Sequence, residues 1–423
     1  MPKPVSPPYE DETKSERIER LGRELIDRLR ASGVAIKYPF PDPMTLRSFS
    51  LGEVAEILGV SDSYLRQLST DGLGPTPELG TAGRRSYTLR QINELRAYLA
   101  SARPKDALKF YPRRREGEKL QIISVAAGSA RTTTAFYLAQ GLALQGFRIL
   151  AIDLDPRGSL SEMFGLVPKL PVRDVSMYAA MRYNDALRAS INEVIRPTPF
   201  DGLGLVPGSF ELSKFDFECS RHYEDATNPD VGVRMVSAIK EVEANYDVVV
   251  IHCPPEPSYL TVGAFEAATG LLVTVRPQLA EIASTAWFVR VLSHRASLIE
   301  RVERPVKYFT KFLVTRHDPR DVSQQEAVAL LRDSLGDDLL TATVWESDAI
   351  REARLKNRSL YELSAGAVGR SAYEQAMETL NSVNAEVMDL ISEVWGRPPI
   401  YVSQASRSTT AGKAKSQSRR LSK

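Results

Sequence analysis

The chain has 423 residues, of which 43% are hydrophobic and 26% are charged, so it can bury a sizeable core and has the length of two or three domains. Its 55 lysines and arginines nearly balance its 53 aspartates and glutamates, which excludes a polyelectrolyte and leaves only local basic clusters for binding nucleic acid. Two cysteines, no apolar leader and no run of about 20 apolar residues argue against a disulfide framework, secretion and a membrane span. We expect a cytoplasmic protein.

Residues 1–44 are predicted to form an N-terminal tail followed by one amphipathic helix. The first 13 residues are polar and rich in proline, and YPFPDP at 38–43 would end the helix. The apolar side chains that recur at helical spacing are Ile18, Leu21, Leu25, Ile26 and Leu29. Such a helix either lies on its own domain or mediates dimerisation, and the pattern favours neither hypothesis.

Residues 45–100 have the pattern of a compact helical module. LGEVAEILGV predicts a first helix with Val54 and Leu58 on its apolar face, and after a short turn Ser61 is suited to cap a second helix in SDSYLRQLSTDGL. An arginine-rich hairpin, GRRSYT, and a third helix complete the module. This order resembles the winged helix-turn-helix domains of the MerR type.

The MerR-type resemblance implies that the second helix enters the major groove of DNA and that the hairpin, or wing, contacts phosphates. The predicted DNA contacts are Ser63, Tyr64, Arg66 and Gln67 on the second helix and Arg84 and Arg85 in the wing. The alternative is a charged surface that is only solvated. The arginine pair beside Tyr87 favours DNA.

Two basic segments flank the remaining part of the chain. Residues 101–119 hold seven basic residues, three acidic ones and two prolines, which predicts a basic linker that is either only solvated or adds salt-dependent contacts to phosphates. Residues 399–423 are rich in serine, threonine and basic residues and contain no acid. This composition predicts a disordered basic tail.

In residues 120–398, continuous apolar runs alternate with amphipathic segments of helix length. Runs of this kind are typical of buried parallel strands, so we expect a doubly wound, mostly parallel α/β sheet with its ligand at the carboxyl ends of the strands. The expected strands are LQIISV, RILAIDL, DGLGLVPG, DVVVIHCPP, GLLVTVRP and KFLVTRHDP.

Several stretches together carry a family resemblance. The helical module, LAQGLALQGFRILAIDLDP, YDVVVIHCPP and AATGLLVTVRPQ closely resemble the RepA branch of the ParA plasmid-partition ATPases, over roughly residues 15–398. The resemblance implies a P-loop NTPase fold of the ParA/MinD type, with ATP or ADP and Mg²⁺ as cofactors. It also implies a homodimer, DNA, a ParB-like (RepB) partner and repression of the protein's own operon.

The phosphate loop departs from the family's pattern K-G-G-x-G-K-T, in which both lysines act on the phosphates. Registered on the threonines, residues 126–132 are Ala-Ala-Gly-Ser-Ala-Arg-Thr, and the planar guanidinium of Arg131 is not interchangeable with an ammonium. Ala130 places a methyl group where the backbone would approach phosphate. Registered on the preceding strand instead, the loop is about three residues short for a nest of amides.

If a phosphate cradle remains, the resemblance assigns residues and roles to it. The cradle would comprise Gly128, Ser129, Arg131, Thr132 and Thr133, with the Thr132 hydroxyl facing Mg²⁺. Asp155 matches the acid that helps to position the attacking water. His252 stands at the position of the Walker B aspartate, and an imidazole is a poor substitute for a carboxylate near Mg²⁺.

These losses predict little or no ATPase activity, because phosphoryl transfer depends on positioning and on charge stabilisation. Three functional hypotheses follow. The first is a DNA-binding repressor or partition protein without turnover, and the second is a diverged working ATPase in which Arg131 and Asp155 suffice. The third is a pseudo-ATPase that pairs with an active paralogue. The sequence does not decide between the first and the third.

Overall fold

The structure, a computed structural model, describes residues 12–31, 45–80, 83–166, 175–222, 231–299 and 308–403. The chain divides into two compact units, 1–43 and 44–423, and each is described by itself. Most of the predicted basic tail, residues 404–423, lies outside the described residues.

The first unit contributes one helix, α1 (Lys14–Ala31). Thr13 begins the helix by donating from its backbone N and its Oγ1 to Glu16 Oε2, at 2.9 and 2.7 Å. The apolar side chains of Ile18, Leu21, Leu25 and Ile26 are exposed within this unit. The predicted amphipathic helix is therefore present, and its role stays a prediction. No helix in the described ranges is long and apolar enough to cross a bilayer.

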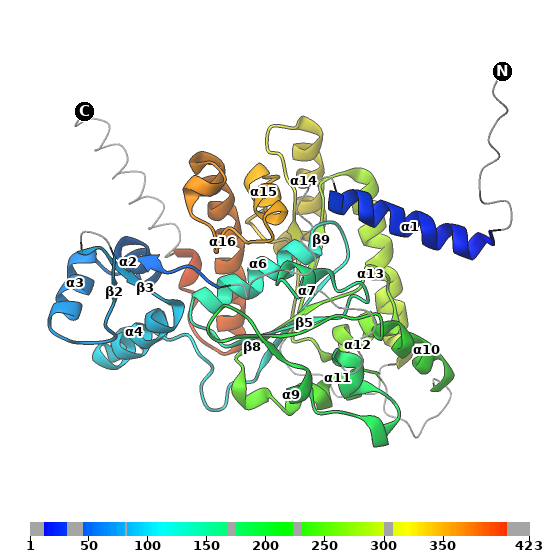
Figure 1. The fold of residues 1–423 in the computed structure, drawn as a ribbon, viewed down its shortest axis with the longest axis horizontal. Coiled ribbons are helices and arrows are strands. Elements are labelled where there is room, and N and C mark those ends of the chain that lie inside the picture. Colours follow the sequence, from blue (N-terminus) through cyan, green and yellow to red (C-terminus); the bar gives the residue numbers. More distant parts are fainter. Residues whose placement is uncertain are drawn as a thin grey trace. The chain divides into compact units, whose positions relative to one another are not determined.

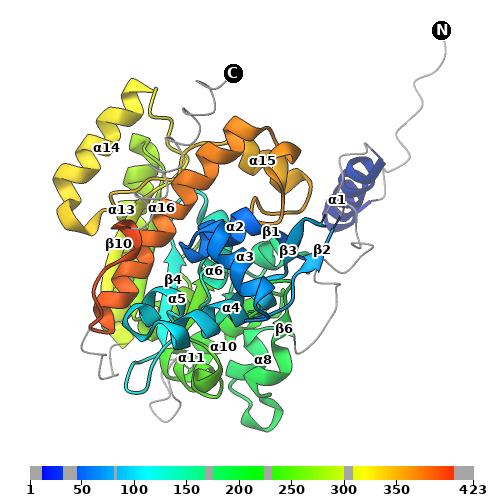
Figure 2. The same ribbon diagram turned by 90° about the vertical axis from the view of Figure 1, so that its left-hand side faces the viewer.

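The second unit begins with a winged-helix module, which we define as residues 49–102. Its helices are α2 (Leu51–Leu58), α3 (Asp62–Thr70) and α4 (Leu89–Ala102), and its strands are β1 (Phe49–Ser50), β2 (Glu78–Leu79) and β3 (Arg85–Tyr87). The strands pair antiparallel in the order β1-β3-β2. Figure 2 shows the module facing the viewer.

Each helix of the module begins at a side-chain cap. Ser50 and Thr88 form capping boxes with Glu53 and Gln91, and Ser61 accepts a hydrogen bond from Tyr64 N, as predicted. Local sequence therefore determines where these helices start.

A seven-stranded sheet forms the centre of the second unit, in the order β10-β9-β4-β8-β5-β7-β6. The predicted strands are β4 (Gln121–Ala126), β5 (Ile149–Asp153), β7 (Leu203–Val206), β8 (Val248–His252), β9 (Gly270–Val275) and β10 (Phe309–Val314), all parallel. The sequence did not indicate β6 (Arg196–Pro197), which pairs antiparallel at the edge, where proline is tolerated.

Helices cover both faces of the sheet (Figure 1). Along β4, Ile123 and Val125 pack into one core with α6 and α16, whereas Ile122 and Ala126 pack into the other with α11 and α12. The helices are α5 (Ala107–Phe110), α6 (Arg131–Leu144), α7 (Ser159–Met163), α8 (Met177–Met181), α9 (Ile191–Val194), α10 (Leu212–His222), α11 (Val231–Lys240), α12 (Tyr259–Ala267), α13 (Leu279–Ile299), α14 (Val322–Leu335), α15 (Asp348–Leu355) and α16 (Arg370–Val394). The predicted fold class is confirmed.

The winged-helix module shares a continuous core with the sheet domain. Arg96 of α4 is fully buried there, and its Nη2 donates to Leu144 O at the end of α6, at 2.8 Å. Burial lowers the pKa of Arg96 to about 10. The end of α6 away from the phosphate loop is thus tied directly to the module.

Candidate functional site

The phosphate-loop segment, residues 127–130, is short and sharply bent. β4 ends at Ala126 and α6 begins at Arg131, so four residues connect them. Ala127 and Ala130 are both left-handed, with φ of 62° and 65°, a conformation that costs a residue with a side chain about 1–2 kcal/mol. This strained backbone conformation therefore persists only because contacts with the surrounding residues stabilise it.

Contacts with neighbouring strands stabilise the conformation of the phosphate-loop segment. A Cβ atom on Gly128 would lie 2.0 Å from Thr274 O of β9, so the loop touches that strand. The hydroxyl of Thr274 donates to Ala127 O at 3.3 Å, and the hydroxyl of Thr315 donates to Ser129 O at 3.0 Å. Carbonyl groups of the segment are thereby tied to β9 and to the residue that follows β10.

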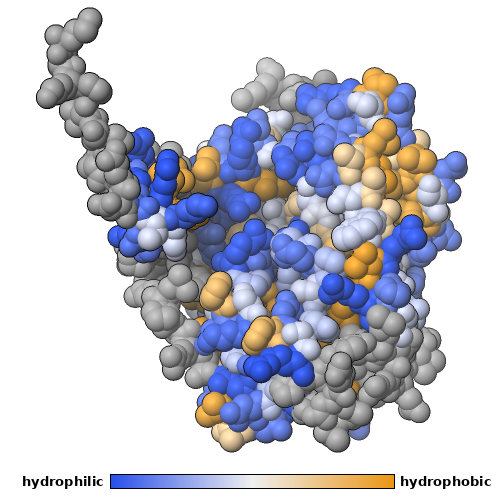
Figure 3. All heavy atoms as spheres, turned by 90° about the vertical axis from the view of Figure 1, so that its right-hand side faces the viewer, coloured by the Kyte–Doolittle hydropathy of each residue, from blue (hydrophilic) through white to orange (hydrophobic). Residues whose placement is uncertain are grey.

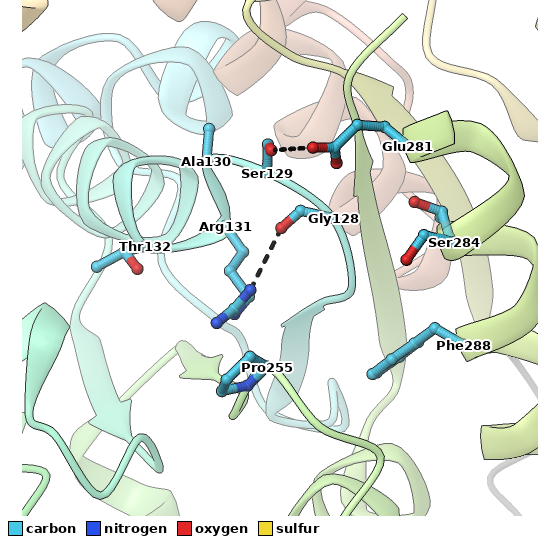
Figure 4. A pocket seen from close by; sticks show the side chains of 10 residues that line it. Gly128, Ser129, Ala130, Arg131, Thr132, Pro255, Glu281, Ser284 and Phe288 are labelled. Carbon is cyan, nitrogen blue, oxygen red and sulfur yellow. Dashed lines mark hydrogen bonds between the residues drawn. The ribbon is translucent and has the colours of Figure 1, made fainter. Parts of the chain in front are cut away.

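The Arg131 side chain folds back over the segment. Its Nη1 donates to Gly128 O at 3.3 Å (Figure 4), and its Nε donates to Cys253 O at 3.2 Å. Burial lowers the pKa of Arg131. Part of the guanidinium's donor capacity is consequently used by the protein's own carbonyls.

Beneath the loop lies a buried chain of polar side chains at the ends of β5 and β8. Asp153 and His252 are neighbours in the sheet register and are both 0% exposed. His252 Nδ1 donates to Asp153 Oδ1 at 2.9 Å, because a carboxylate only accepts. His252 Nε2 lies 3.1 Å from Thr132 Oγ1. Thr133 is half-buried beside it on α6.

Asp155 lies in the turn after β5, and its carboxylate is paired. It accepts from Arg157 Nε and Nη2 at 3.1 and 3.0 Å and from Ser159 Oγ at 2.8 Å. Burial acts to raise the pKa of Asp155, but these hydrogen bonds and the nearby guanidinium hold it below its usual value. The acid therefore faces donors from its own turn.

The phosphate-loop segment and α13 line a cavity of about 340 Å³. Ser129, Arg131 and Thr132 line one side, and Glu281 and Ser284 of α13 line the other (Figure 4). Ser129 Oγ donates to Glu281 Oε1 at 3.1 Å. The structure thus brings the predicted loop residues together, but it adds a carboxylate to the same cavity, which is unfavourable for phosphate.

The predicted DNA contacts lie on the surface of the winged-helix module. On α3, Ser63, Arg66 and Gln67 are exposed, although the Gln67 amide donates to Asp71 at 2.7 Å. Tyr64 is half-buried: it packs against the hydrophobic core, and the Arg103 guanidinium lies 4.4 Å from the centre of its ring.

The two wing arginines differ in their surroundings. Arg84 is exposed, whereas Arg85 is half-buried and donates from Nε to Ser69 Oγ at 3.3 Å. Arg84 is therefore free to reach a phosphate group, and Arg85 connects the wing to the end of α3. Base contacts from α3 and phosphate contacts from the wing remain predictions for these residues.

Comparisons with known proteins agree with both halves of this description. An AAA domain model matches residues 118–295, and a model of MerR HTH family regulatory proteins matches residues 49–100. The "Putative replication protein A" of Sinorhizobium fredii is 41% identical over 83% of this chain and 88% of its own length. The protein of the same name from Rhizobium rhizogenes is 37% identical over 90% and 95%.

The chain belongs to the RepA family of ParA-type plasmid partition proteins. This confirms the predicted family. The protein SopA of Escherichia coli is a more distant relative, 27% identical over 82% of this chain and 90% of its own length. A solved partition protein has the same fold, with a TM-score of 0.62 and 17% identity over 89% of this chain and 99% of that one.

The cofactors of this RepA-family fold can be tested against the donors that are present. Mg²⁺ requires oxygen ligands in octahedral geometry, but here an imidazole stands between Asp153 and Thr132. Within the described ranges, no three or more His, Cys, Asp or Glu side chains are placed to hold a metal ion. The donor set does not fit Mg²⁺.

Sequence reasoning missed three residues of this RepA-family site. Asp153 precedes Asp155 in the same DLDP stretch, so the alternation of that strand and turn could have indicated it. Ser159 lies only four residues after Asp155, but its serine hydroxyl was given no role. Glu281 had no local signal, because α13 reaches the site only through the tertiary fold.

Proposed function

We propose that this RepA-family protein is a DNA-binding dimer of the cytoplasm that represses its own operon and acts in plasmid segregation with a ParB-like (RepB) partner, without turning over ATP. The observation that carries the proposal is the contrast between its two sites. Ser63, Arg66 and Arg84 of the winged-helix module face solvent, whereas Arg131 and His252 are engaged by the protein itself.

Loss of turnover follows from charge and geometry. The family's lysines and Walker B aspartate would supply positive charge and metal support, and the transition state of phosphoryl transfer depends on both. Here the nearest cation, Arg131, donates to Gly128 O and Cys253 O, and Glu281 adds a negative charge to the cavity. This supports the first hypothesis over a working diverged ATPase.

Exposed apolar side chains support the dimer. Leu279 and Trp287 on α13 are 71% and 62% exposed, and Phe217 on α10 is 63% exposed. Figure 3 shows the side of the molecule on which these helices lie, where small apolar areas are interspersed with polar ones. Contiguous exposed apolar areas are typical of association surfaces, so we propose that Leu279 and Trp287, which lie on the same helix, form part of the dimer surface.

The domain division proposed for this function has a DNA-binding domain at 45–100, which contains most of the winged-helix module, a basic linker at 101–119 and a ParA-like domain at 120–398. In the linker, Arg114 donates to Glu243 O and pairs with Glu243 Oε1 at 3.1 Å. Arg103, Lys109 and Arg113 are engaged as well, by the Tyr64 ring, Gly59 O and Gly146 O. Lys105, Arg115 and Lys119 are the exposed basic residues that we propose for DNA.

The test is binding to DNA from upstream of the protein's own operon, measured by fluorescence anisotropy. The double variant Arg66→Ala, Arg84→Ala should bind about 10- to 100-fold more weakly, because it loses a base contact and a phosphate contact. Arg351→Ala, which removes an exposed arginine of α15, should bind normally. Sedimentation of the same samples should show two chains per operator. Binding that is absent in the wild type, or unchanged in the double variant, would overturn the proposal.

A further inference from the structure

The ends of β5 and β8 hold an imidazole where the family resemblance places a carboxylate beside Mg²⁺. His252 is the last residue of β8, and Asp153, its partner in the sheet register, is the last residue of β5. The ring spans the space between Asp153 Oδ1, at 2.9 Å, and Thr132 Oγ1, at 3.1 Å. Two oxygens that a cation would need are therefore already hydrogen-bonded to one ring.

The remaining lone pairs of Asp153 are also used. Its Oδ2 accepts from the backbone N and the Oγ of Ser161, both at 2.8 Å, and its Oδ1 accepts from Asp155 N at 3.1 Å. Ser161 Oγ accepts in turn from Gly208 N at 2.8 Å. A fully satisfied buried network of this kind is rigid and resists rearrangement.

Asp155 is not available either, because Arg157 and Ser159 donate to both of its carboxylate oxygens. Ser159 Oγ lies 3.5 Å from Thr132 Oγ1, which closes the chain from Asp155 back to His252. On the other side of the loop, Arg131 bridges Gly128 O and Cys253 O. Protein side chains thus occupy both the phosphate side and the metal side of the site.

We propose that this chain replaces metal and phosphate with its own side chains, and that the His252 ring is the group that keeps a divalent cation from Asp153 and Thr132. An aspartate at 252 would place a second carboxylate next to Asp153, with the Thr132 hydroxyl within reach. Two carboxylates at the ends of adjacent strands repel each other, and a hard divalent cation with oxygen ligands relieves that repulsion. A single substitution should therefore create a cation site at the ends of β5 and β8.

The proposal rests on the loss of metal support in the proposed function, but its test is separate because it measures cation binding in the absence of DNA. The experiment uses the full chain as wild type, as His252→Asp and as His252→Asp with Asp153→Asn. Mn²⁺ is the probe, because free and bound Mn²⁺ are distinguished by electron paramagnetic resonance. Thermal unfolding is followed in EDTA and in Mn²⁺.

His252→Asp is expected to bind one Mn²⁺ at least about ten-fold more tightly than the wild type, and to regain in Mn²⁺ the unfolding temperature that it loses in EDTA. The added Asp153→Asn leaves one carboxylate beside an amide, so it should weaken Mn²⁺ binding and reduce the recovery of the unfolding temperature. A wild type that binds Mn²⁺ as tightly as His252→Asp would overturn the proposal. A folded His252→Asp variant that binds no Mn²⁺ would also overturn the proposal. That outcome would mean that His252 only fills the core.

A second variant covers the case in which His252→Asp does not fold even in Mn²⁺. His252→Asn removes the ring and keeps a side-chain donor for Asp153, so Mn²⁺ should bind to it more tightly than to the wild type. Equal binding by His252→Asn and the wild type would overturn the proposal. Failure of DNA binding would leave all these outcomes unchanged, so the two proposals fail separately.

Discussion

The winged-helix module and the phosphate site both depend on polar residues at the start of a helix, but they use them in opposite ways. In the module, Ser61 caps α3 and leaves Arg66 and its neighbours facing solvent. In the phosphate site, α6 starts at the left-handed Ala130 without a side-chain cap, and Arg131 turns back onto its own loop. A site retains its capacity to bind a ligand when its hydrogen-bond donors face solvent. It loses that capacity when acceptors of the protein itself occupy those donors.

The largest expected effect comes from Gly128→Ala. Its new Cβ would meet the backbone carbonyl of Thr274 at 2.0 Å, and a strand carbonyl cannot move without disturbing the sheet. We expect the free energy of unfolding to fall by about 3–5 kcal/mol in urea titrations.

Gly83→Ala in the wing is the matched control. Gly83 has a φ of 67°, but no described atom lies within 4 Å of the position of its Cβ, so only the backbone cost of about 1–2 kcal/mol applies. If the two variants lose equal free energy of unfolding, the phosphate-loop segment does not pack closely against β9.

A smaller effect is expected from Asp155→Asn. The substitution removes charge-assisted hydrogen bonds from Arg157 and Ser159 and should lower the free energy of unfolding by about 1–2 kcal/mol at pH 7. The folded-state pKa of Asp155 is lowered. Its contribution is therefore complete above the unfolded pKa of about 3.9 and is lost as the pH falls through the folded value.

The difference between wild type and Asp155→Asn should accordingly stay constant from about pH 5 to 8 and shrink below about pH 4. Urea titrations across this range provide the measurement. Glu374→Gln, on an exposed pair with Arg370, should change stability little at any of these pH values. A difference that persists undiminished at pH 3 would contradict the assigned role of the carboxylate.

The smallest expected effect is that of nucleotide. A ligand with a Kd of 10 µM would stabilise the folded chain by about 2.7 kcal/mol at 1 mM, which corresponds to a clear rise in unfolding temperature. We expect 1 mM ATP with Mg²⁺ to leave that temperature unchanged, because the donors of the loop are engaged. Phosphate release should match that of Asp155→Ala. A rise of several degrees would return the protein to the nucleotide-binding members of its family.

Much of the fold could be predicted from local patterns. Apolar runs indicated six parallel strands because strands buried on both faces carry few polar residues. The capping residue Ser61 indicated the start of α3. The edge strand at Arg196–Pro197 was not predicted, because a strand of two residues is too short to show a hydrophobic periodicity.

The candidate site could be predicted only in part. The substitutions at positions 131 and 252 are visible in the sequence, since each interrupts a motif of known spacing. Their new partners are not visible. Glu281 stands 152 residues from Ser129, and Asp153 stands 99 residues from His252, so no local pattern connects them.

The sequence by itself determined the family, the order of strands and helices, and the loss of the lysines and the Walker B carboxylate, because each is a property of neighbouring residues. Only the tertiary structure decided what replaced them. Parallel strands bring Asp153 and His252 together at one edge of the sheet, and Thr132 at the start of α6 completes the chain. Whether a polar side chain binds a ligand or another side chain depends on which groups the fold places within hydrogen-bonding distance.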